Sequence, residues 1–305
     1  MSEANVVVLD RPRFRIGAGP WRGPEEILRI DRDVRDAIGI PHRGGDMVQP
    51  WARPKPVKPK SVAVELAYSF DVKALPSGDL FLAIERPEMY LVRINDSEVN
   101  TDVDCGWWCD RSMRKLRLDP ASLKTGKNEL RLTCRYDELH PGLEIVYLLG
   151  SFGVAVKGTT VAITEMPRSL VIGDWVKQGL PFYSGSVTYS TRHKPKLQKG
   201  ERLFVQVPDY LGCAVRVLVD GRPAGVIAWE PNEVDITDFV GKSTISIAIE
   251  VIGHRRNSHG PLHLTDRNPP WVGPRQFVST GKLWSDEYVL KPCGLMVAPR
   301  LIVRR

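Results

Sequence analysis

The chain has 305 residues, of which 42% are hydrophobic and 26% charged, a composition typical of globular proteins and unlike that of disordered or fibrous chains. Because domains cluster near 100 to 150 residues, this length predicts two hydrophobic cores. The formal charge of +7 raises the question of nucleic-acid binding. However, Lys and Arg do not cluster with interleaved aromatic residues as in nucleic-acid interfaces, so we expect no nucleic-acid partner.

No stretch approaches the roughly 20 apolar residues of a membrane span, and the N-terminus lacks the basic and apolar parts of an export signal. We therefore expect a cytoplasmic protein without a membrane partner. The five cysteines are odd in number and scattered, which argues against a disulfide framework. Cys105 and Cys109 (CGWWC) have no second pair at zinc-site spacing. We expect them to be buried thiols, and we expect no metal site and no cofactor.

Residues 5–60 are rich in Pro, Gly and Arg, and one segment among them has helical spacing. Pro24 to Ile38 (PEEILRIDRDVRDAI) is apolar at roughly every third or fourth residue, and Gly39 with Pro41 suits a helix end. The run Arg53 to Lys60 (RPKPVKPK) is interpreted as an extended linker. Residues 1–60 are thus expected to be an N-terminal extension and linker with one short helix.

From Ser61 onward, short alternating apolar runs are separated by turn residues, which predicts strands. Examples are LFLAIE, NELRLTCRY, RLFVQVP and TISIAIEVIG. Such closely spaced strands with few helical stretches predict an all-β fold with two antiparallel β-sandwich domains in tandem. We place the first sandwich at residues 61–160 and the second at 161–305, with the boundary near 155–170.

The two halves also repeat one another about 120 residues apart. LFLAIERPEMYLVRINDSEV leads to LRLDPASLKTGKNELRLTCRY, and RLFVQVPDYLGCAVRVLVDGRPAG leads to VDITDFVGKSTISIAIEV. Each half has two strands, a polar turn (Asn95 and Asp96; Asp220 and Gly221), an x-D-x-S/T-x-x segment, Gly-Lys and a further strand. A repeat of this length indicates a duplicated domain.

The second half resembles the sugar-binding jelly-roll domain of glycoside hydrolase family 2. The residues that carry the resemblance are Tyr183-x-Gly185-x-x-x-Tyr189, AVRVLVDGRPAGVIAWEP and Val234-Asp235-Ile236-Thr237. IGDWVKQGLPFYSGSVTYSTR and GHRRNSHGPLH are similar to the C-terminal region of large bacterial glycosidases that resemble glycoside hydrolase family 106 rhamnosidases. LAIERPEMYLVRIN and GWWCDRSMRKLRLD resemble the sandwich that precedes it, and RGGDMVQPWARP resembles the segment joining it to the catalytic part.

This resemblance implies two jelly-roll, galactose-binding-like domains. In such glycosidases the chemistry sits in an upstream barrel, for which there is no room before Asn5. The expected function is therefore that of a non-catalytic carbohydrate-associated module of a glycoside hydrolase, which binds glycan or supports a catalytic domain. Its expected partners are carbohydrate and a glycosidase catalytic domain or chain, and no catalytic residue is assigned.

Two segments offer candidate ligand-binding residues. Trp107 and Trp108, among Asp102, Asp104 and Asp110, combine an aromatic platform with acids, although carboxylates in Asp-rich turns are normally exposed. In an alternating strand one of these two Trp residues should be buried and the other exposed, and nothing in the sequence decides which.

The second segment is the polar loop Gly253 to His263 (GHRRNSHGPLH), which follows an apolar strand. We select Arg255, Asn257, His259 and His263 as ligand-binding candidates, with Trp271 downstream as a possible platform. Loop-structuring hydrogen bonds, a ligand or partner-domain contact, and a metal site are the three interpretations. Asp235, Thr237, Tyr183 and Tyr189 are expected to be structural.

Two other functions compete with the binding module. One is a small self-contained glycosidase or other carbohydrate-active enzyme, whose two carboxyl groups would flank the scissile bond. That hypothesis can be tested by mutating a carboxylate such as Asp104 or Glu144, which should abolish hydrolysis. The other is a structural or assembly protein with an exposed apolar surface. Fold alone does not choose among these functions.

Overall fold

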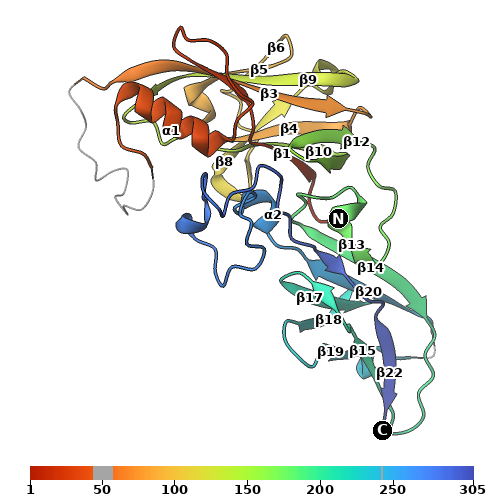
Figure 1. The fold of residues 1–305 in the computed structure, drawn as a ribbon. Helices are drawn as coiled ribbons and strands as arrows, with labels where there is room; N and C mark the ends of the chain where they lie inside the picture. Colours follow the sequence, from red (N-terminus) through yellow and green to blue (C-terminus); the bar gives the residue numbers. More distant parts are fainter. Residues whose placement is uncertain (44–57, 242) are drawn as a thin grey trace. The chain divides into compact units, whose positions relative to one another are not determined.

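The computed structural model describes residues 1–43, 58–241 and 243–305 (Figure 1). The fold is all-β, as the strand pattern predicts: antiparallel sheets dominate, and the helices of the described residues are α1 (Ile27–Ile38), α2 (Arg256–His259) and short 3-10 turns. Among these residues no helix is long and apolar enough to span a membrane.

The chain forms two compact units that are discontinuous in sequence. Unit 2 contains residues 5–166 and 260–289, and unit 1 contains residues 1–4, 167–259 and 290–305. The sequence predicted contiguous domains instead. Residues 5–43 form part of unit 2 rather than a separate extension, because they supply two strands and a helix that pack on its sheets.

Unit 2 is a sandwich of two sheets. The first sheet has five strands in the order β1 (Asn5–Leu9), β10 (Val146–Ser151), β4 (Ser77–Glu85), β8 (Asp110–Leu118), β7 (Trp107–Trp108). The second sheet has the order β11 (Gly153–Lys157), β12 (Thr160–Thr164), β3 (Ser61–Val72), β9 (Gly126–Asp137), β5 (Tyr90–Ile94), β6 (Ser97–Val99), and β2 (Arg13–Ile16) also pairs with β3. Alternate apolar residues of these strands form the core.

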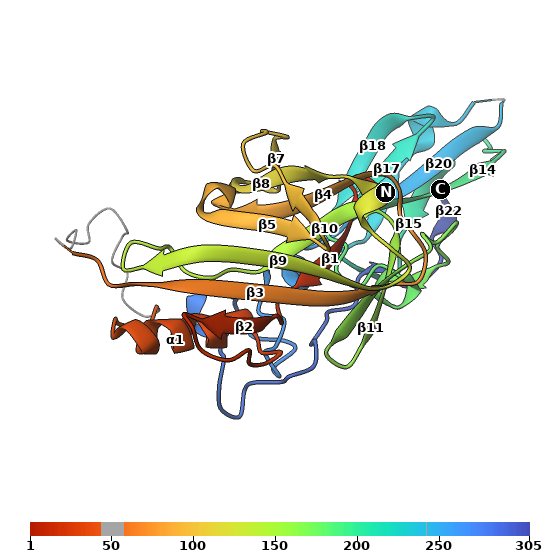
Figure 2. The same ribbon diagram turned by 90° about the horizontal axis from the view of Figure 1, so that it is seen from above.

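Helix α1 covers part of this sandwich beside β2 and β3 (Figures 1 and 2). Ile27, Ile30 and Val34 lie on its buried face. The side chain of Glu26 accepts hydrogen bonds from the first backbone N–H groups, and Gly39 ends the helix with φ 66°. The predicted helix is therefore confirmed, with its start three residues after Pro24.

Unit 1 has two principal sheets and a small one. The first principal sheet has the order β14 (Ser186–His193), β20 (Ile245–Ile252), β17 (Ala214–Val219), β18 (Arg222–Ile227). The second has the order β19 (Glu233–Asp235), β15 (Arg202–Gln206), β22 (Arg300–Arg304). The small sheet joins β13 (Gly173–Asp174), β21 (Gly294–Leu295) and β16 (Tyr210–Leu211).

The predicted repeat is confirmed by the strand pairing. Seven strands of unit 2 have a counterpart in unit 1, in the same chain order: β3, β4, β5, β6, β8, β9 and β10 correspond to β14, β15, β17, β18, β19, β20 and β22. The corresponding strands form the same antiparallel pairs. The turns match as well: Asn95 and Asp220 both have positive φ. The backbone N–H of Asn95 donates to Glu129, and that of Asp220 donates to Ser246, each at 2.8 Å.

Several smaller predictions have their outcomes here. Cys109 is exposed and Cys105 half-buried, so the prediction of buried thiols is wrong; Cys109 has φ 53° in the tight turn between β7 and β8, which leaves its side chain in solvent. Asp235 caps the following turn through the N–H of Thr237 at 2.9 Å, as expected. The joining segment RGGDMVQPWARP and most of the linker RPKPVKPK lie outside the described residues.

Candidate functional site

The predicted polar loop Gly253 to His263 is divided between the two units, since residues up to His259 belong to unit 1 and the rest to unit 2. Arg255 forms a two-point ion pair with Glu3, with N–O distances of 2.9 and 2.8 Å. Asn257 is fully buried and holds both backbone groups of Lys291, each at 2.8 Å. These contacts fit the interpretation that the loop's polar side chains structure the loop.

His259 and His263 also form hydrogen bonds within the protein, one to a neighbouring residue and the other to a residue far away in the sequence. The hydroxyl of Ser258 lies 2.7 Å from Nδ1 of His259, one residue away. His263 is buried, and its Nε2 lies 2.8 Å from the carboxylate of Asp10, which also accepts a 2.6 Å hydrogen bond from the hydroxyl of Tyr288. We call Asp10, His263 and Tyr288 the Asp10 cluster; it fastens both ends of the segment 260–289 to the chain that follows β1.

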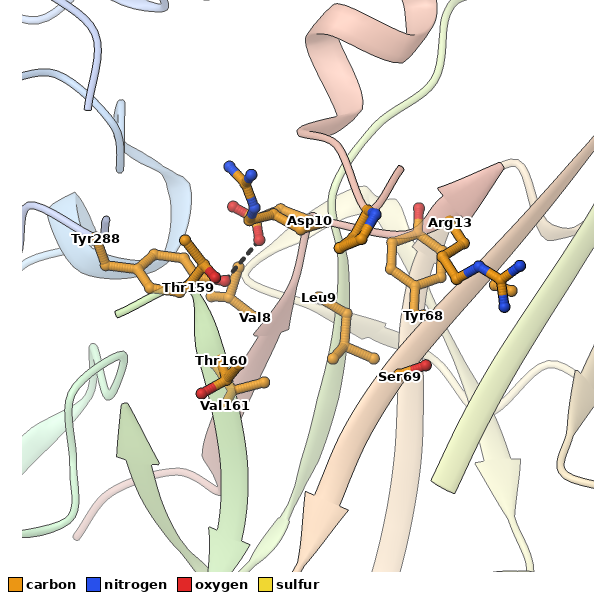
Figure 3. A pocket seen from close by; sticks show the side chains of 13 residues that line it. Val8, Leu9, Asp10, Arg13, Tyr68, Ser69, Thr159, Thr160, Val161 and Tyr288 are labelled. Atoms are coloured by element: carbon orange, nitrogen blue, oxygen red, sulfur yellow. Dashed lines mark hydrogen bonds between the residues drawn. The ribbon is translucent and has the colours of Figure 1, made fainter. Parts of the chain in front are cut away.

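Beside the Asp10 cluster lies a pocket of about 250 Å³ between β1, β3 and β12 (Figure 3). Figure 3 shows Asp10 and Tyr288 pointing toward one another at one side of it, joined by their hydrogen bond. The Asp10 side chain is completely buried and already accepts two hydrogen bonds. Because ligand pockets usually measure about 300 to 1,000 Å³ and offer free polar groups, this pocket is a weak candidate.

Helix α1 contacts the same segment from its first turn. The guanidinium of Arg29 lies 4.1 Å from the ring centre of Trp284, and its Nε donates to the backbone carbonyl of Ser279. Trp284 in turn stacks on His263, with ring centres 4.7 Å apart. The segment 260–289 has few regular elements of its own, so these side-chain contacts hold it in place.

A larger pocket, of about 430 Å³, lies where this segment meets α1, and we call it the Trp271 pocket. The residues that line it come from four separate parts of unit 2: Leu28, Asp31, Arg32, Arg43, Glu144, Gly273, Pro274, Phe277 and Ser279. Trp271 is 59% exposed and packs on the backbone of Gly273, where a Cβ would collide with its indole ring. The volume falls within the usual range for small-molecule sites.

The apolar side of the Trp271 pocket consists of Leu28, Pro274 and Phe277, next to the exposed ring of Trp271. The N–H of Gly273 donates to the side chain of Gln276 at 2.9 Å, which fixes the short turn that carries Pro274. An aromatic surface beside an open pocket offers the flat apolar contact that the C–H face of a sugar requires.

The polar side is built around Arg43, which bridges two carboxylates. Its Nε donates to Asp31 at 2.9 Å, its Nη1 donates to Glu144, and its Nη2 donates to the carbonyl of Leu143 at 2.7 Å. Asp31 is buried and also accepts from Arg35 and Tyr136. This array is a rigid polar wall, since each of its buried charges has an opposite charge beside it.

The ionisation of this wall follows from its neighbours. Burial alone would raise the pKa of Asp31, but the charges of Arg43 and Arg35 outweigh it and lower that pKa below its ordinary value. The same carboxylates raise the pKa of Arg43, against the effect of burial. Asp31 and Arg43 are therefore both charged at neutral pH. Glu144, which is half-buried, is the more accessible of the two carboxylates that Arg43 binds.

One group of the Trp271 pocket lacks a partner. Ser279 is 3% exposed, and within the described part of the chain its hydroxyl has no hydrogen-bond partner. Buried hydroxyl groups are normally paired, because an unpaired one costs about 1 to 3 kcal/mol. A bound molecule with its own hydroxyl group would satisfy Ser279.

The Trp107–Trp108 segment has a different outcome. Trp108 is 7% exposed and packs against Tyr147 with ring centres 5.0 Å apart, whereas Trp107 is 53% exposed. The structure thus decides which ring is buried. Asp104 accepts from the N–H of Gly106 at 2.7 Å, and this hydrogen bond is the main reason why its pKa is lowered. Asp104 and Asp110 thus accept hydrogen bonds from backbone N–H groups two residues further on and stabilise turns. None of the five pockets described for this structure contains these acids or Trp107.

Of the residues that line this pocket, Glu144 was named from the sequence, as a carboxylate to test. Trp271, which was selected from the sequence as a ligand-binding candidate, packs on the lining residue Gly273. Arg32 and Asp31 lie on α1, whose helical pattern was visible, yet that pattern is defined by apolar residues and does not single out polar ones. Phe277 and Ser279 follow the Pro269-Pro270 pair without any motif. Groups of His, Cys, Asp and Glu that would suit a metal ion do not occur among the residues described.

No protein-family model matches the chain, and no curated protein matches it either. Among solved structures it is similar to parts of glycoside hydrolases. For a rhamnosidase from Novosphingobium sp. PP1Y the identity is 15% and the TM-score 0.31, over 90% of this chain and 26% of that one. For a β-D-mannosidase from Dictyoglomus thermophilum the identity is 12% and the TM-score 0.30, over 86% and 32%. An anti-sigma factor domain-containing protein has 11% identity and a TM-score of 0.20, over 64% and 76%. The chain spans about a quarter to a third of the two glycosidases.

Proposed function

We propose that this chain is a non-catalytic, carbohydrate-associated β-sandwich module that binds a saccharide in the Trp271 pocket of unit 2. The observation that carries the proposal is a pocket of about 430 Å³ in which the buried Ser279 hydroxyl has no partner among the described residues. The exposed Trp271 packs on Gly273, one of the residues that line this pocket. The resemblance of the sequence to glycosidase sandwiches agrees with this class of ligand. The sugar ring would stack on Trp271 and Phe277, with its hydroxyl groups toward Glu144, Arg32 and Ser279.

The ionisation of the pocket favours binding over hydrolysis. Glycosidases generally need one carboxylic acid with a raised pKa and a second carboxylate across the scissile bond. Here Asp31 and Glu144 both pair with Arg43, and the pKa of Asp31 is lowered. An acid that stays ionised accepts hydrogen bonds from sugar hydroxyl groups but does not protonate a leaving group.

The proposal is tested by titrating the full chain with a panel of rhamnosides, galactosides and mannosides in a calorimeter. Replacing Trp271 by Ala should weaken binding at least about tenfold, the usual effect of removing a central aromatic anchor, with little change in melting temperature. Trp107→Ala is the matched control, since it removes another exposed Trp of unit 2 away from the pocket and should leave binding unchanged.

Ser279→Ala separates binding from stability. Removing a buried hydroxyl without a partner should leave the melting temperature unchanged or slightly higher, while saccharide binding weakens by roughly three- to tenfold. No binding to any sugar, or equal losses in Trp271→Ala and Trp107→Ala, would contradict the proposal. Robust hydrolysis of an aryl glycoside that disappears in Glu144→Gln would support the enzyme hypothesis instead.

A further inference from the structure

Unit 1 has an apolar groove along one open side of its sandwich. The groove measures about 700 Å³ and lies between β14 and β22, with core residues such as Val205, Ile247 and Ile249 at its base. In the described part of the chain β14 pairs with β20 alone and β22 with β15 alone. Strand β22 therefore presents an unpaired backbone edge on one side of an apolar floor. On the other side, β14 has no second partner strand, although the backbone of its first residue, Ser186, is hydrogen-bonded to Ser2.

Some of the core-facing side chains along these strands are exposed. On β22, Leu301 and Val303 pair across the sheet with the buried residues Val205 and Leu203 and so point toward the same face. Yet Val303 is 49% exposed. On β14, Thr191 likewise faces the core side opposite Ile247 and is exposed. Part of the core of unit 1 is thus uncovered.

The equivalent side of unit 2 is closed by an additional strand. Strand β10, the counterpart of β22, pairs with β4 on one side and with β1 on the other. Strand β1 (NVVVL) runs antiparallel to β10, and all five of its residues are buried. Because the two units share one strand order, the duplicate indicates what fits the open edge of unit 1: an extended, largely apolar strand antiparallel to β22.

The positive charge around the groove favours acidic residues at the two ends of such a strand. Unit 1 contains 16 Lys and Arg residues against 10 Asp and Glu residues, which gives it a net charge of +6 out of the chain's +7. Arg192 on β14, Lys194 just beyond it and Arg300 on β22 are exposed. Potentials of this sign attract acidic partners.

We propose that the open side of unit 1 binds an extended segment of another polypeptide, apolar at alternate positions and acidic at its flanks. This segment adds to β22 as β1 adds to β10. Main-chain hydrogen bonds to the edge supply affinity, and the alternate side chains that enter the groove supply specificity. This interaction is independent of saccharide binding, which the Trp271 pocket of unit 2 would carry.

The probe is a synthetic peptide, EDVTVTVDE, blocked at both ends and carrying a fluorophore, and its binding to the full chain is followed by fluorescence polarisation. Successive N–H groups of a strand point to opposite sides, so only one set pairs with β22. We therefore compare a peptide N-methylated at the three Val residues with one N-methylated at the two Thr residues. One of these two sets of methyl groups should weaken binding more than about tenfold, and the other should change it less than about threefold. Hydrogen exchange should slow in β22.

Charge reversal tests the basic rim. The double variant Arg192→Glu, Arg300→Glu should bind the acidic peptide about two- to tenfold more weakly and the Lys-flanked peptide KKVTVTVKK more tightly, as expected for exposed charges. Arg111→Glu, an exposed site in unit 2, is the matched control and should change neither. Circular dichroism verifies that each variant is folded.

Three results would overturn the proposal. The first is no binding at millimolar peptide, or equal effects of the two N-methylated sets. The second is a concentration-dependent dimer that Arg300→Glu abolishes, which would assign the groove to a second copy of the chain. The third is displacement of the peptide by a saccharide that also binds after Trp271→Ala. Failure of saccharide binding at Trp271 alone leaves this inference standing.

Discussion

Strands β10 and β22 hold the same place in two copies of one strand order, yet their surroundings differ. The first five residues of β10 are buried, because β1 covers one edge and β4 the other. In β22 the two terminal Arg residues and Val303 are exposed, and only β15 pairs with it in the described chain. A shared framework of seven strands therefore does not determine whether a sandwich is closed.

The difference arises from segments outside the repeat. Unit 2 gains β1, β2 and α1 from residues 5–43 and a further layer from residues 260–289. Those additions bring buried charges with them, namely the Asp10 cluster and the Arg43 wall. The additions of unit 1, namely the small sheet of β13, β21 and β16 and helix α2, do not pair with β22. Its ion pairs Arg202–Asp235, Arg255–Glu3 and Arg304–Glu233 each include an exposed Arg. The additions that close unit 2 thus also build its candidate site.

The largest effect should come from the Asp10 cluster. Replacing Asp10 by Ala leaves His263 and the Tyr288 hydroxyl without their shared buried acceptor, which should lower the free energy of unfolding by about 3 to 5 kcal/mol. Urea unfolding measures the loss, and hydrogen exchange should show residues 260–289 opening first.

Asp286→Ala is the matched control for that substitution, because it removes an acid of the same segment whose side chain is 60% exposed. Its ion pairs with Arg11 and Arg29 are screened by solvent, so the loss should be at most about 1 kcal/mol. Equal losses in the two variants would mean that the Asp10 cluster does not fasten the segment.

The next largest effect compares the two strands directly. Leu148→Ala in β10 removes a completely buried side chain and should cost about 2 to 5 kcal/mol. Leu301→Ala in β22 makes the same change at a half-buried side chain that lines the groove. It should lower the free energy of unfolding by less than about 1 kcal/mol, because the Leu301 side chain buries less apolar surface on folding. Similar losses in urea unfolding would show that the edge of β22 is covered in solution.

Much of the framework could be predicted from the sequence, since alternation, turn residues and helix ends are local signals. The repeat was visible because Asn95 and Asp220 occupy the same turn and their flanking strands keep the same order. By contrast, β1 lay unrecognised in a segment read as an extension. Its run NVVVL has no polar alternation, because both of its faces are buried between other elements.

The candidate site could be predicted only in part, because it is assembled from segments far apart in the chain. Trp271 was selected for its aromatic ring, and in the structure that ring packs on Gly273, a lining residue of the Trp271 pocket. His263 was selected for its polarity, yet it pairs with Asp10, 253 residues away. No local pattern distinguishes an imidazole that faces a ligand from one that faces a buried carboxylate, since the difference depends on tertiary contacts.

The smallest expected effect concerns the pH dependence of stability, for which carboxyl groups of the two units have pKa values shifted in opposite directions. In unit 1, hydrogen bonds from Arg304 and Thr237 lower the pKa values of the half-buried acids Glu233 and Asp235. In unit 2, burial and then the charge of Asp10 raise the pKa of Glu26 to about 7.

A carboxyl group whose folded pKa lies above its unfolded value binds a proton on folding between the two values. The stabilisation of the folded state by proton binding at Glu26 is therefore complete below about pH 4.5 and is lost as the pH rises toward 7. Burial of His140 lowers its pKa to about 4 and gives the opposite trend, so a Glu26 variant must be compared with the wild type at each pH.

Glu26→Gln keeps an oxygen that accepts from the N–H groups of Leu28 and Arg29 but does not ionise. Relative to the wild type it should gain about 2 kcal/mol between pH 5 and 7, measured by urea unfolding at each pH. Parallel profiles for the two proteins would show that Glu26 does not titrate in this range, and would remove the difference in pH response between the two units.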